Sequence, residues 1–507
     1  MKKTTGNGYL QGAAVLGAAA IVSKLLGTLQ KIPLQNLAGE EAFGIYNVVY
    51  PLYTFILTLA VAGLPLTVSA FVSEARALGK PGETRRVLRT ATATLVSTGL
   101  LFFLLLYGGA DAIASLFGVP KTAAAIRSVS WALLVAPVMA ALRGYFQGFG
   151  EMVPTAVSQV AEQLIRVAVM LGLLLYFLHL GYGPEKIAAG ATFGSTAGAL
   201  AGLLVMLGYW RREQRLRAYL PEEAGAADMP YPVQTEPAGA FVRRFLRAAI
   251  PVCLGSMALP ILTLVDSATL PRLLAADGLA ESARLHAVGL YNHAQPLVQL
   301  VALIATSMTA ALVPAIAEAR AAGSRELLAR RTELSVRCAW LIGFAAAFGL
   351  AAAAKPINIM MFTSPEGTRT MAILAFTAAF STLQIVSGSV LIGLGEAKRP
   401  ALHLFAAAVL KLVLNALLVP FFGIAGAAAA AVAAYALAAL WNLAALTRLT
   451  GVRFPAAAYL WRPLAAALAM TAAVLAIRIG FLGALAVARA PRRHPHSRLA
   501  VARAPRR

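Results

Sequence analysis

The stretch "GIYNVVYP", which runs from Gly44 to Pro51, decides the fold, because "GLYNHAQP", from Gly289 to Pro296, repeats it 245 residues later. Gly, Tyr, Asn and Pro recur at the same places in both copies. "GFGE" at 148–151 and "GLGE" at 393–396 are separated by the same 245 residues, and "SEARALG" at 73–79 resembles "AEARAAG" at 317–323. Several matches at nearly one spacing indicate two homologous halves.

The composition of the chain is that of a membrane protein. Of its 507 residues, 59% are hydrophobic and 13% are charged, whereas about a quarter of the residues of a soluble domain are charged. Many separate apolar runs predict an all-α polytopic protein, because lipid offers backbone groups no hydrogen-bonding partner. The predicted spans are 9–30, 43–72, 87–109, 123–147, 155–180, 185–209, 242–270, 285–316, 333–354, 369–394, 400–420, 423–447 and 456–479.

Lys and Arg are concentrated in alternate loops. The rich set includes 73–89, 211–244, 320–331 and 448–453, and the loops between them carry few. Because Lys and Arg favour the cytoplasmic side, the N-terminus is predicted to be cytoplasmic. In a soluble protein the net charge of +23 would suggest nucleic acid. Here the charges orient the chain, and no nucleic-acid partner is expected.

Two six-helix lobes in a parallel repeat are predicted. The N-terminal lobe is 1–210, a polar cytoplasmic linker is 211–241, and the C-terminal lobe is 242–447, followed by an extra helix at 448–480 and a basic tail at 481–507. An even number of helices separates equivalent positions, so both lobes have the same orientation. Such lobes surround a central cavity and rock to expose it alternately. A duplicated scaffold without a pathway is the alternative.

The first span carries a polar face. Lys24, Thr28, Lys31 and Gln35 are spaced so that they lie on one side of a continuous helix. An ionisable residue at the centre of a span costs about 2.5–3.5 kcal/mol, so it needs a partner, a cavity or a function. Lys24 and Thr28 are predicted to bind substrate. Lys31 either joins them or reaches the outer interface, and Pro33 is expected to bend or end this helix.

Equivalent spans of the two halves carry a second set of charges. Glu162 and Arg166 are four residues apart and can pair on one helical face, either as a neutralised pair or for function. Lys411 is the repeat equivalent of Arg166, and Asn415 is its nearest polar neighbour on that face. Arg166 and Lys411 are candidate substrate ligands, and Glu162 is a candidate ion-coupling residue.

The second half carries further polar candidates. Asp266 in "LTLVDSATLPRLL" is a candidate for ion coupling or a counter-ion for a cation in the cavity. Arg272 follows it near the outer end. Asn292, His293 and Gln295 cluster beside Pro296 and are candidate substrate ligands. For His293, a packed and hydrogen-bonded ring and a proton switch are both open.

The sequence carries no pattern typical of an enzyme. We find no Walker motif, no metal-ligand cluster and no pairing of nucleophile and base. The chain is therefore not expected to be an enzyme, to use ATP or to hold a cofactor.

The charges inside the spans are mainly cationic, with Lys24, Arg166 and Lys411 against Glu162 and Asp266. A cationic cavity between apolar lobes suits an anionic head group on a lipid tail, because phosphates bind to Lys and Arg. A soluble anion fits these charges as well. Membrane lipids are the other expected partner, and no oligomeric state follows from the sequence.

Several stretches resemble a known group of transporters. The segment 21–75, which begins "IVSKLLGTLQKIPLQNLAGEEAFGIYN", resembles the start of the stage V sporulation protein B/YtgP group. That group belongs to the polysaccharide transporter branch of the multidrug/oligosaccharidyl-lipid/polysaccharide (MOP) exporter superfamily. "SKLLGTLQK" is also similar to the lipid II flippase (MurJ) family, with Lys24 and Lys31 in place of two cavity arginines. "VDSATLPRLL" and "GLGEAKRP" resemble the second lobe of the same group.

The resemblance implies a flippase in the bacterial cytoplasmic membrane. It implies outward movement of an undecaprenyl-linked oligosaccharide, either a lipid II-like peptidoglycan precursor or a related spore or surface polysaccharide unit. It also implies twelve core helices, usually followed by two more, and transport driven by an ion gradient or the membrane potential and not by ATP. Two departures are the lysines, which lose the bidentate phosphate geometry of arginine, and a C-terminus without a recognisable fourteenth helix. The alternatives are a cation-coupled multidrug exporter built around Asp266 and Glu162, and a non-transporting scaffold for cell-wall synthesis.

Overall fold

The computed structural model describes residues 6–61, 64–77, 81–219, 238–276, 278–455, 457–473 and 476, and within these ranges all regular structure is helical. The helices of the first half are α1 (Gly6–Leu29), α2 (Lys31–Val61), α3 (Leu64–Ala77), α4 (Pro81–Gly108), α5 (Ala110–Leu116), η1 (Pro120–Thr122), α6 (Ala123–Ser130), α7 (Ala132–Gly148), α8 (Val153–His179) and α9 (Pro184–Tyr219).

The second half repeats this pattern of long and short helices. Its helices are α10 (Ala238–Ala276), α11 (Glu281–Tyr291), η2 (Asn292–Ala294), α12 (Gln295–Ala321), α13 (Arg325–Ala352), α14 (Ala354–Phe362), α15 (Thr368–Ala375), α16 (Thr377–Gly393), α17 (Lys398–Phe422), α18 (Ile424–Thr450) and the π-helical η3 (Ala457–Trp461). A further helical stretch follows at 462–473. The predicted basic tail, 481–507, lies outside the described residues.

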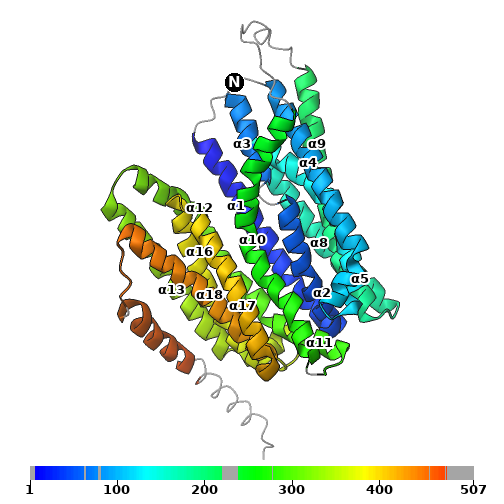
Figure 1. Cartoon of the computed structure of the whole chain (residues 1–507), viewed down its shortest axis with the longest axis vertical. Coiled ribbons are helices and arrows are strands. Elements are labelled where there is room, and N and C mark those ends of the chain that lie inside the picture. Colours follow the sequence, from blue (N-terminus) through cyan, green and yellow to red (C-terminus); the bar gives the residue numbers. More distant parts are fainter. Residues whose placement is uncertain are drawn as a thin grey trace, which may run out of the picture.

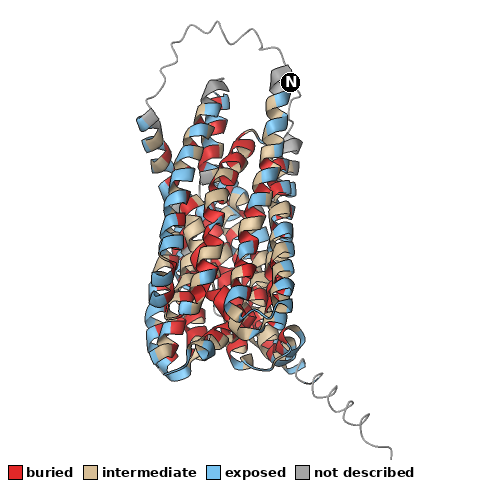
Figure 2. Ribbon diagram, turned by 90° about the vertical axis from the view of Figure 1, so that its right-hand side faces the viewer, coloured by how far each residue is buried: buried red, intermediate tan, exposed pale blue. Residues whose placement is uncertain are grey.

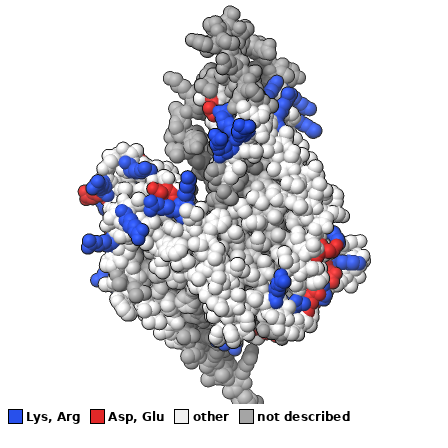
Figure 3. Space-filling model, viewed as in Figure 1, with Lys and Arg blue, Asp and Glu red and all other residues white. Residues whose placement is uncertain are grey.

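The helices are long and apolar enough to cross a membrane. Within the described residues, ten helical segments meet that criterion. Large apolar side chains are exposed, among them Leu104, Leu417 and Phe421, while buried residues face the interior of each bundle (Figure 2). Figure 3 shows a broad surface without charges between the two charged ends of the molecule. This arrangement is that of a multi-pass membrane protein.

The first two helices differ from the prediction. The break falls at Gln30, so Lys24 and Thr28 lie in α1 whereas Lys31 and Gln35 lie in α2. The predicted polar face is therefore divided between two helices; Lys24, Thr28 and Lys31 still line one cavity, and Gln35 does not. The expected break is present, because α1 ends at Leu29, four residues before Pro33, whose ring would clash with the Leu29 carbonyl in a continuous helix. Pro33 itself lies in the first turn of α2, where a missing backbone N–H is tolerated. α2 bends again at Gly39, whose φ of 80° favours glycine.

The linker between the lobes is shorter than predicted. α9 continues to Tyr219 and α10 begins at Ala238, whereas the sequence prediction placed the linker at 211–241. The segment "RREQRLRAY" explains the difference, because Arg, Glu, Gln and Leu are good helix formers and let the helix continue past the apolar run.

Equivalent contacts in the two halves support the duplication. Arg76 donates from Nη1 to the carbonyl of Phe149 at 2.8 Å, and Arg320 donates from Nη1 to the carbonyl of Leu394. Each carbonyl precedes a glycine, Gly150 or Gly395, that has a φ of 79°. The "GFGE" and "GLGE" turns therefore end their helices in the same way, and each is held by an arginine from the motif that the sequence matched one residue out of phase.

The two bundles meet near one end of the molecule. Figure 1 shows them together where α2 and α11 lie, and diverging toward the end at which α3 and α9 lie. α2 packs against both α10 and α11 of the other half. At the α2–α11 crossing, a Cβ atom on Gly44 would lie 2.0 Å from the carbonyl oxygen of Leu285, and one on Gly289 would lie 2.6 Å from that of Glu40. We call this the closed end and the opposite one the linker end.

Candidate functional site

A cavity of about 1650 Å³ lies between the two lobes. Residues of α1, α2 and α8 line one side, and residues of α10, α12, α16, α17 and α18 line the other. Its wall reaches from Asn292 and Gln295 near the closed end to Glu396 and Lys398 near the linker end. Figure 3 shows the surface notched between the lobes near that second end. The cavity is therefore closed where the lobes meet.

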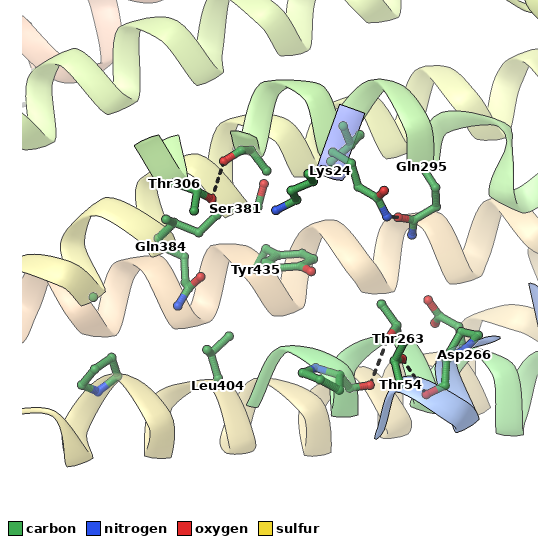
Figure 4. A pocket seen from close by; sticks show the side chains of 18 of the residues that line it. Lys24, Thr54, Thr263, Asp266, Gln295, Thr306, Ser381, Gln384, Leu404 and Tyr435 are labelled. Carbon is green, nitrogen blue, oxygen red and sulfur yellow. Dashed lines mark hydrogen bonds between the residues drawn. The ribbon is translucent and has the colours of Figure 1, made fainter. Parts of the chain in front are cut away.

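Lys24 and Lys31 lie on the cavity wall, as does Thr28. Figure 4 shows Lys24 pointing into the pocket toward Ser381 and Tyr435. Lys31 is 6% exposed, and its Nζ lies 6.0 Å from the centre of the Tyr50 ring. Within the described part of the chain, neither ammonium group has a carboxylate within ion-pair distance. Both lysines therefore bring an uncompensated positive charge to the cavity.

The polar wall includes amide groups that the sequence analysis did not single out. Thr28 Oγ1 donates to Gln299 Oε1 at 3.3 Å, which connects α1 to α12 across the cavity. Gln384 also lines the pocket, and Figure 4 shows it at the end opposite Gln295, which the sequence analysis named. Gln299 and Gln384 stand alone in apolar runs, so only the folded arrangement brings them together with Gln295.

Asp266 lies on the wall but its charge is neutralised. Lys411 Nζ is 2.6 Å from Asp266 Oδ2, Tyr291 donates its hydroxyl to the same oxygen at 2.7 Å, and Asn415 donates to Oδ1 at 3.2 Å. Lys411 also donates to the carbonyl of Leu262 at 2.9 Å. Of the two roles considered for Asp266, the geometry is that of a counter-ion, and its cation comes from the protein itself.

The equivalent cluster in the first lobe is built around Glu162. Arg166 approaches it at 2.7 Å and Arg143, which the sequence analysis did not single out, at 2.9 Å. Arg143 also donates to Ser158 Oγ at 2.7 Å. The repeat equivalents Arg166 and Lys411 thus each meet a carboxylate, one from the same helix and one from α10. Neither is among the residues that line the cavity.

Arg272 lies at the closed end and not on the cavity wall. Its guanidinium donates to the carbonyl of Leu116 in the other lobe at 3.3 Å. Neighbouring bonds join the lobes in the same way: Arg284 donates to the carbonyl of Gly118 at 2.6 Å, and the backbone N–H of Lys121 donates to Glu281 Oε1 at 2.8 Å. Arg272 therefore belongs to the contacts that hold this end shut.

The cluster of Asn292, His293 and Gln295 is divided by the structure. Asn292 and Gln295 line the cavity, whereas the His293 side chain is fully buried at the closed end. Its ring lies between Glu40 of the first lobe, at 3.0 Å, and Asn358 of α14, at 2.8 Å. Glu40 and Asn358 were missed, because they lie outside the predicted spans or alone in an apolar run.

Among the described residues, no group of three His, Cys, Asp or Glu side chains is placed to hold a metal ion. The candidate site consists of the cavity with its two lysines, the two buried ion-pair clusters beside it, and the closed end where the lobes meet. The arrangement can bind an anionic group in the cavity, and it can expose that group to one end at a time.

Comparisons with known proteins identify families and relatives that the chain resembles. Residues 9–320 match the family model "Polysaccharide biosynthesis protein", and residues 251–417 match the model "MatE". The chain is 32% identical to "Uncharacterized membrane protein YabM" of Bacillus subtilis (strain 168) over 83% of this chain and 76% of that one. It is 29% identical to "Lipid II flippase MurJ" of the same organism over 88% of this chain and 84% of that one.

Solved structures share the fold. An inward-facing multidrug resistance MATE family transporter of the MOP superfamily matches with a TM-score of 0.69 at 15% identity, over 87% of this chain and all of that one. A structure of lipid II flippase MurJ in an inward closed conformation matches with a TM-score of 0.67 at 13% identity, over 90% of this chain and 91% of that one. The predicted all-α fold of two six-helix lobes is confirmed. The chain belongs to the polysaccharide biosynthesis protein family of MOP-superfamily transporters, which are not enzymes.

Proposed function

We propose that the chain is a flippase that moves an undecaprenyl-linked anionic oligosaccharide outward across the bacterial cytoplasmic membrane by alternating access. Its linker end would face the cytoplasm, because the loops there are rich in Lys and Arg. The observation that carries the proposal is the pair of uncompensated lysines, Lys24 and Lys31, on the wall of the cavity between the lobes.

The charge distribution supports an anionic ligand. The two carboxylates considered for ion coupling, Asp266 and Glu162, already meet Lys411 and two arginines. Glu396, on the wall near the linker end, pairs with Arg399 at 3.0 Å. Phosphate oxygens suit Lys24 and Lys31, because an ammonium group is a compact charge with three donors that tolerates many phosphate orientations.

The size of the cavity supports a head group larger than a typical drug. Drug-sized ligands occupy pockets of about 300–1,000 Å³, whereas this cavity measures about 1650 Å³. Glutamine, asparagine, serine and threonine side chains on its wall can bond sugar hydroxyls. A polyprenyl tail would remain in the lipid along the apolar outer faces of the lobes.

The test is flipping in proteoliposomes with fluorescent lipid II and with other undecaprenyl-pyrophosphate glycans. The Lys24→Gln/Lys31→Gln double variant should flip at least about tenfold more slowly, since each lost charge–phosphate contact is worth about 1.5 kcal/mol or more. Lys186→Gln is the matched control, because Lys186 is exposed and lies over the Tyr182 ring outside the cavity. Normal flipping by the double variant would overturn the assignment of these lysines.

The two alternatives predict different results. A cation-coupled drug exporter needs an available carboxylate, so drug transport would be lost in Asp266→Asn while the lysine variants kept it. A non-transporting scaffold would show no flipping with any lipid-linked glycan, and cavity variants would support cell-wall synthesis normally. The ion pair of Asp266 with Lys411 at 2.6 Å argues against the exporter.

A further inference from the structure

His293 is a fully buried imidazole with an oxygen acceptor opposite each ring nitrogen. Nδ1 lies 2.8 Å from Asn358 Oδ1. Nε2 lies 3.0 Å from Oε1 and 3.1 Å from Oε2 of Glu40, which comes from the other lobe. The ring stacks on Phe362 with centres 4.1 Å apart. His293 therefore connects the lobes through a site from which bulk water is excluded.

The Asn358 amide is oriented by its own bonds. Its Nδ2 group donates to the carbonyl of Glu366 at 2.6 Å and to Thr368 Oγ1 at 3.3 Å. The oxygen that faces His293 is consequently the carbonyl oxygen, which can only accept. Nδ1 must therefore carry a hydrogen.

In the closed state, Nε2 cannot be an unprotonated nitrogen opposite an ionised Glu40. It faces the Glu40 carboxyl group, and an unprotonated nitrogen against a carboxylate would bring lone pairs together. One proton must lie between them, either as an imidazolium opposite a carboxylate or as a neutral ring opposite a carboxylic acid. Because the two groups are coupled, this proton belongs to the pair. Gln35 Nε2 also donates to Glu40 Oε1 at 2.6 Å, which orients the carboxyl group.

The other carboxylates near the pair already have partners. On α2, Glu41 pairs with Lys121 at 2.7 Å, and beyond α14, Glu366 approaches His286 at 3.5 Å. Among the cations on the elements that pack here, Lys355 and Arg369 are exposed, Arg284 donates to the carbonyl of Gly118, and Lys31 of α2 is buried on the cavity wall. Glu281, on α11, accepts from the backbone of Lys121. Nothing described around the ring compensates its charge except Glu40.

We propose that His293 and Glu40 form a proton-binding site that fastens the two lobes at the closed end. Closing this end takes up one proton, and opening it releases that proton. The proposal rests on the alternating access of the proposed function and names a proton as one ion to which that movement responds. It needs no substrate, so it is tested separately from flipping.

Proton linkage sets the sign and the size of the effect. Since the closed state holds one more proton than the open state, acid favours closure, and the ratio of closed to open molecules changes at most tenfold per pH unit.

The test measures the distance between the lobes in the full-length protein in nanodiscs without substrate. Both native cysteines, Cys253 and Cys338, are replaced by Ser, and spin labels are placed at Leu180→Cys and Leu279→Cys, whose side chains are exposed on the first and second lobe. We expect the short-distance population to rise as the pH is lowered from 8.5 to 5. A distance distribution that does not change over this range would overturn the proposal.

Three variants distinguish loss of the proton site from a general structural effect of a substitution. His293→Gln should abolish the pH response, and Glu40→Gln should abolish it too, because a glutamine amide can donate to an unprotonated Nε2 and closure then needs no extra proton. His286→Gln is the matched control, since this histidine also approaches a glutamate but is exposed and stays within one lobe. A His293→Gln variant that folds and keeps the wild-type midpoint would contradict the proposal. Lost flipping with an intact pH response would contradict the proposed function alone.

Discussion

Gly44 and Gly289, the first residues of the two copies of the repeated phrase, meet the opposite helix at equivalent points. Gly44 faces the carbonyl of Leu285, four residues before Gly289, and Gly289 faces the carbonyl of Glu40, four residues before Gly44. Equivalent residues of α2 and α11 therefore make equivalent contacts with each other, as at an isologous dimer interface. The repeated phrase marks the pseudo-two-fold axis between the lobes.

Gly44→Ala is predicted to loosen the closed end. A Cβ atom there would lie 2.0 Å from the Leu285 carbonyl oxygen, so α2 and α11 must separate and the bonds beside them lengthen. The measurement is the distance between labels at Leu180 and Leu279, which should shift toward longer values at every pH.

Gly289→Ala should act in the same direction but less strongly, because its Cβ atom would lie 2.6 Å from the Glu40 carbonyl. Gly172→Ala in α8 is the control, since no atom lies within 4 Å of a Cβ atom at that position. An unchanged distance distribution in Gly44→Ala would show that the two helices do not form the seal.

Lys411→Met is predicted to destabilise the second lobe. It leaves Asp266, which is 7% exposed, without its cation, and breaking a buried ion pair costs about 3–5 kcal/mol. Adding Asp266→Asn should restore most of the loss, because the amide can still bond Tyr291 and Asn415. Thermal unfolding in detergent measures this, with Lys355→Met as the exposed control. A Lys411→Met variant as stable as wild type would contradict the ion-pair assignment.

The duplication and the helical class could be predicted because both depend on local or periodic information. Four identities in "GIYNVVYP" and "GLYNHAQP", at the spacing shared by "GFGE" and "GLGE", are visible in the sequence. The apolar runs predict the spans for the same reason. The pairing of Glu162 with Arg166 was also accessible, because four residues on a helix place two side chains on one face.

The partners that join different helices could not be predicted. Lys411 and Asp266 are 145 residues apart, and Glu40 and His293 are 253 residues apart. No periodicity relates such positions. The break at Gln30 agrees with the predicted end of the first span and with the proline expected to bend or end that helix, but the second helix begins at Lys31 rather than at the predicted residue 43. Gln35 does not line the cavity; its side-chain amide donates to Glu40 Oε1 instead.

The three residues of the first-lobe cluster are predicted to contribute unequally to stability. Glu162 lies between two arginines, at 2.9 Å from Arg143 and 2.7 Å from Arg166. Glu162→Gln leaves two largely buried guanidinium groups without the carboxylate that they share, whereas Arg166→Gln leaves the Glu162–Arg143 pair intact. We therefore expect Glu162→Gln to lower the free energy of unfolding by about 3 kcal/mol and Arg166→Gln by about 1 kcal/mol.

Thermal unfolding of the two single variants and of Glu162→Gln/Arg166→Gln tests this order. The double variant should be more stable than Glu162→Gln alone, because it removes one of the two cations left without that carboxylate. Arg127→Gln is the control, since its pair with Asp111 is exposed and worth about 0–1 kcal/mol. Equal losses for Glu162→Gln and Arg166→Gln would mean that Arg143 does not share the carboxylate. Arg166 would then be the sole partner of Glu162, as the sequence spacing alone suggests.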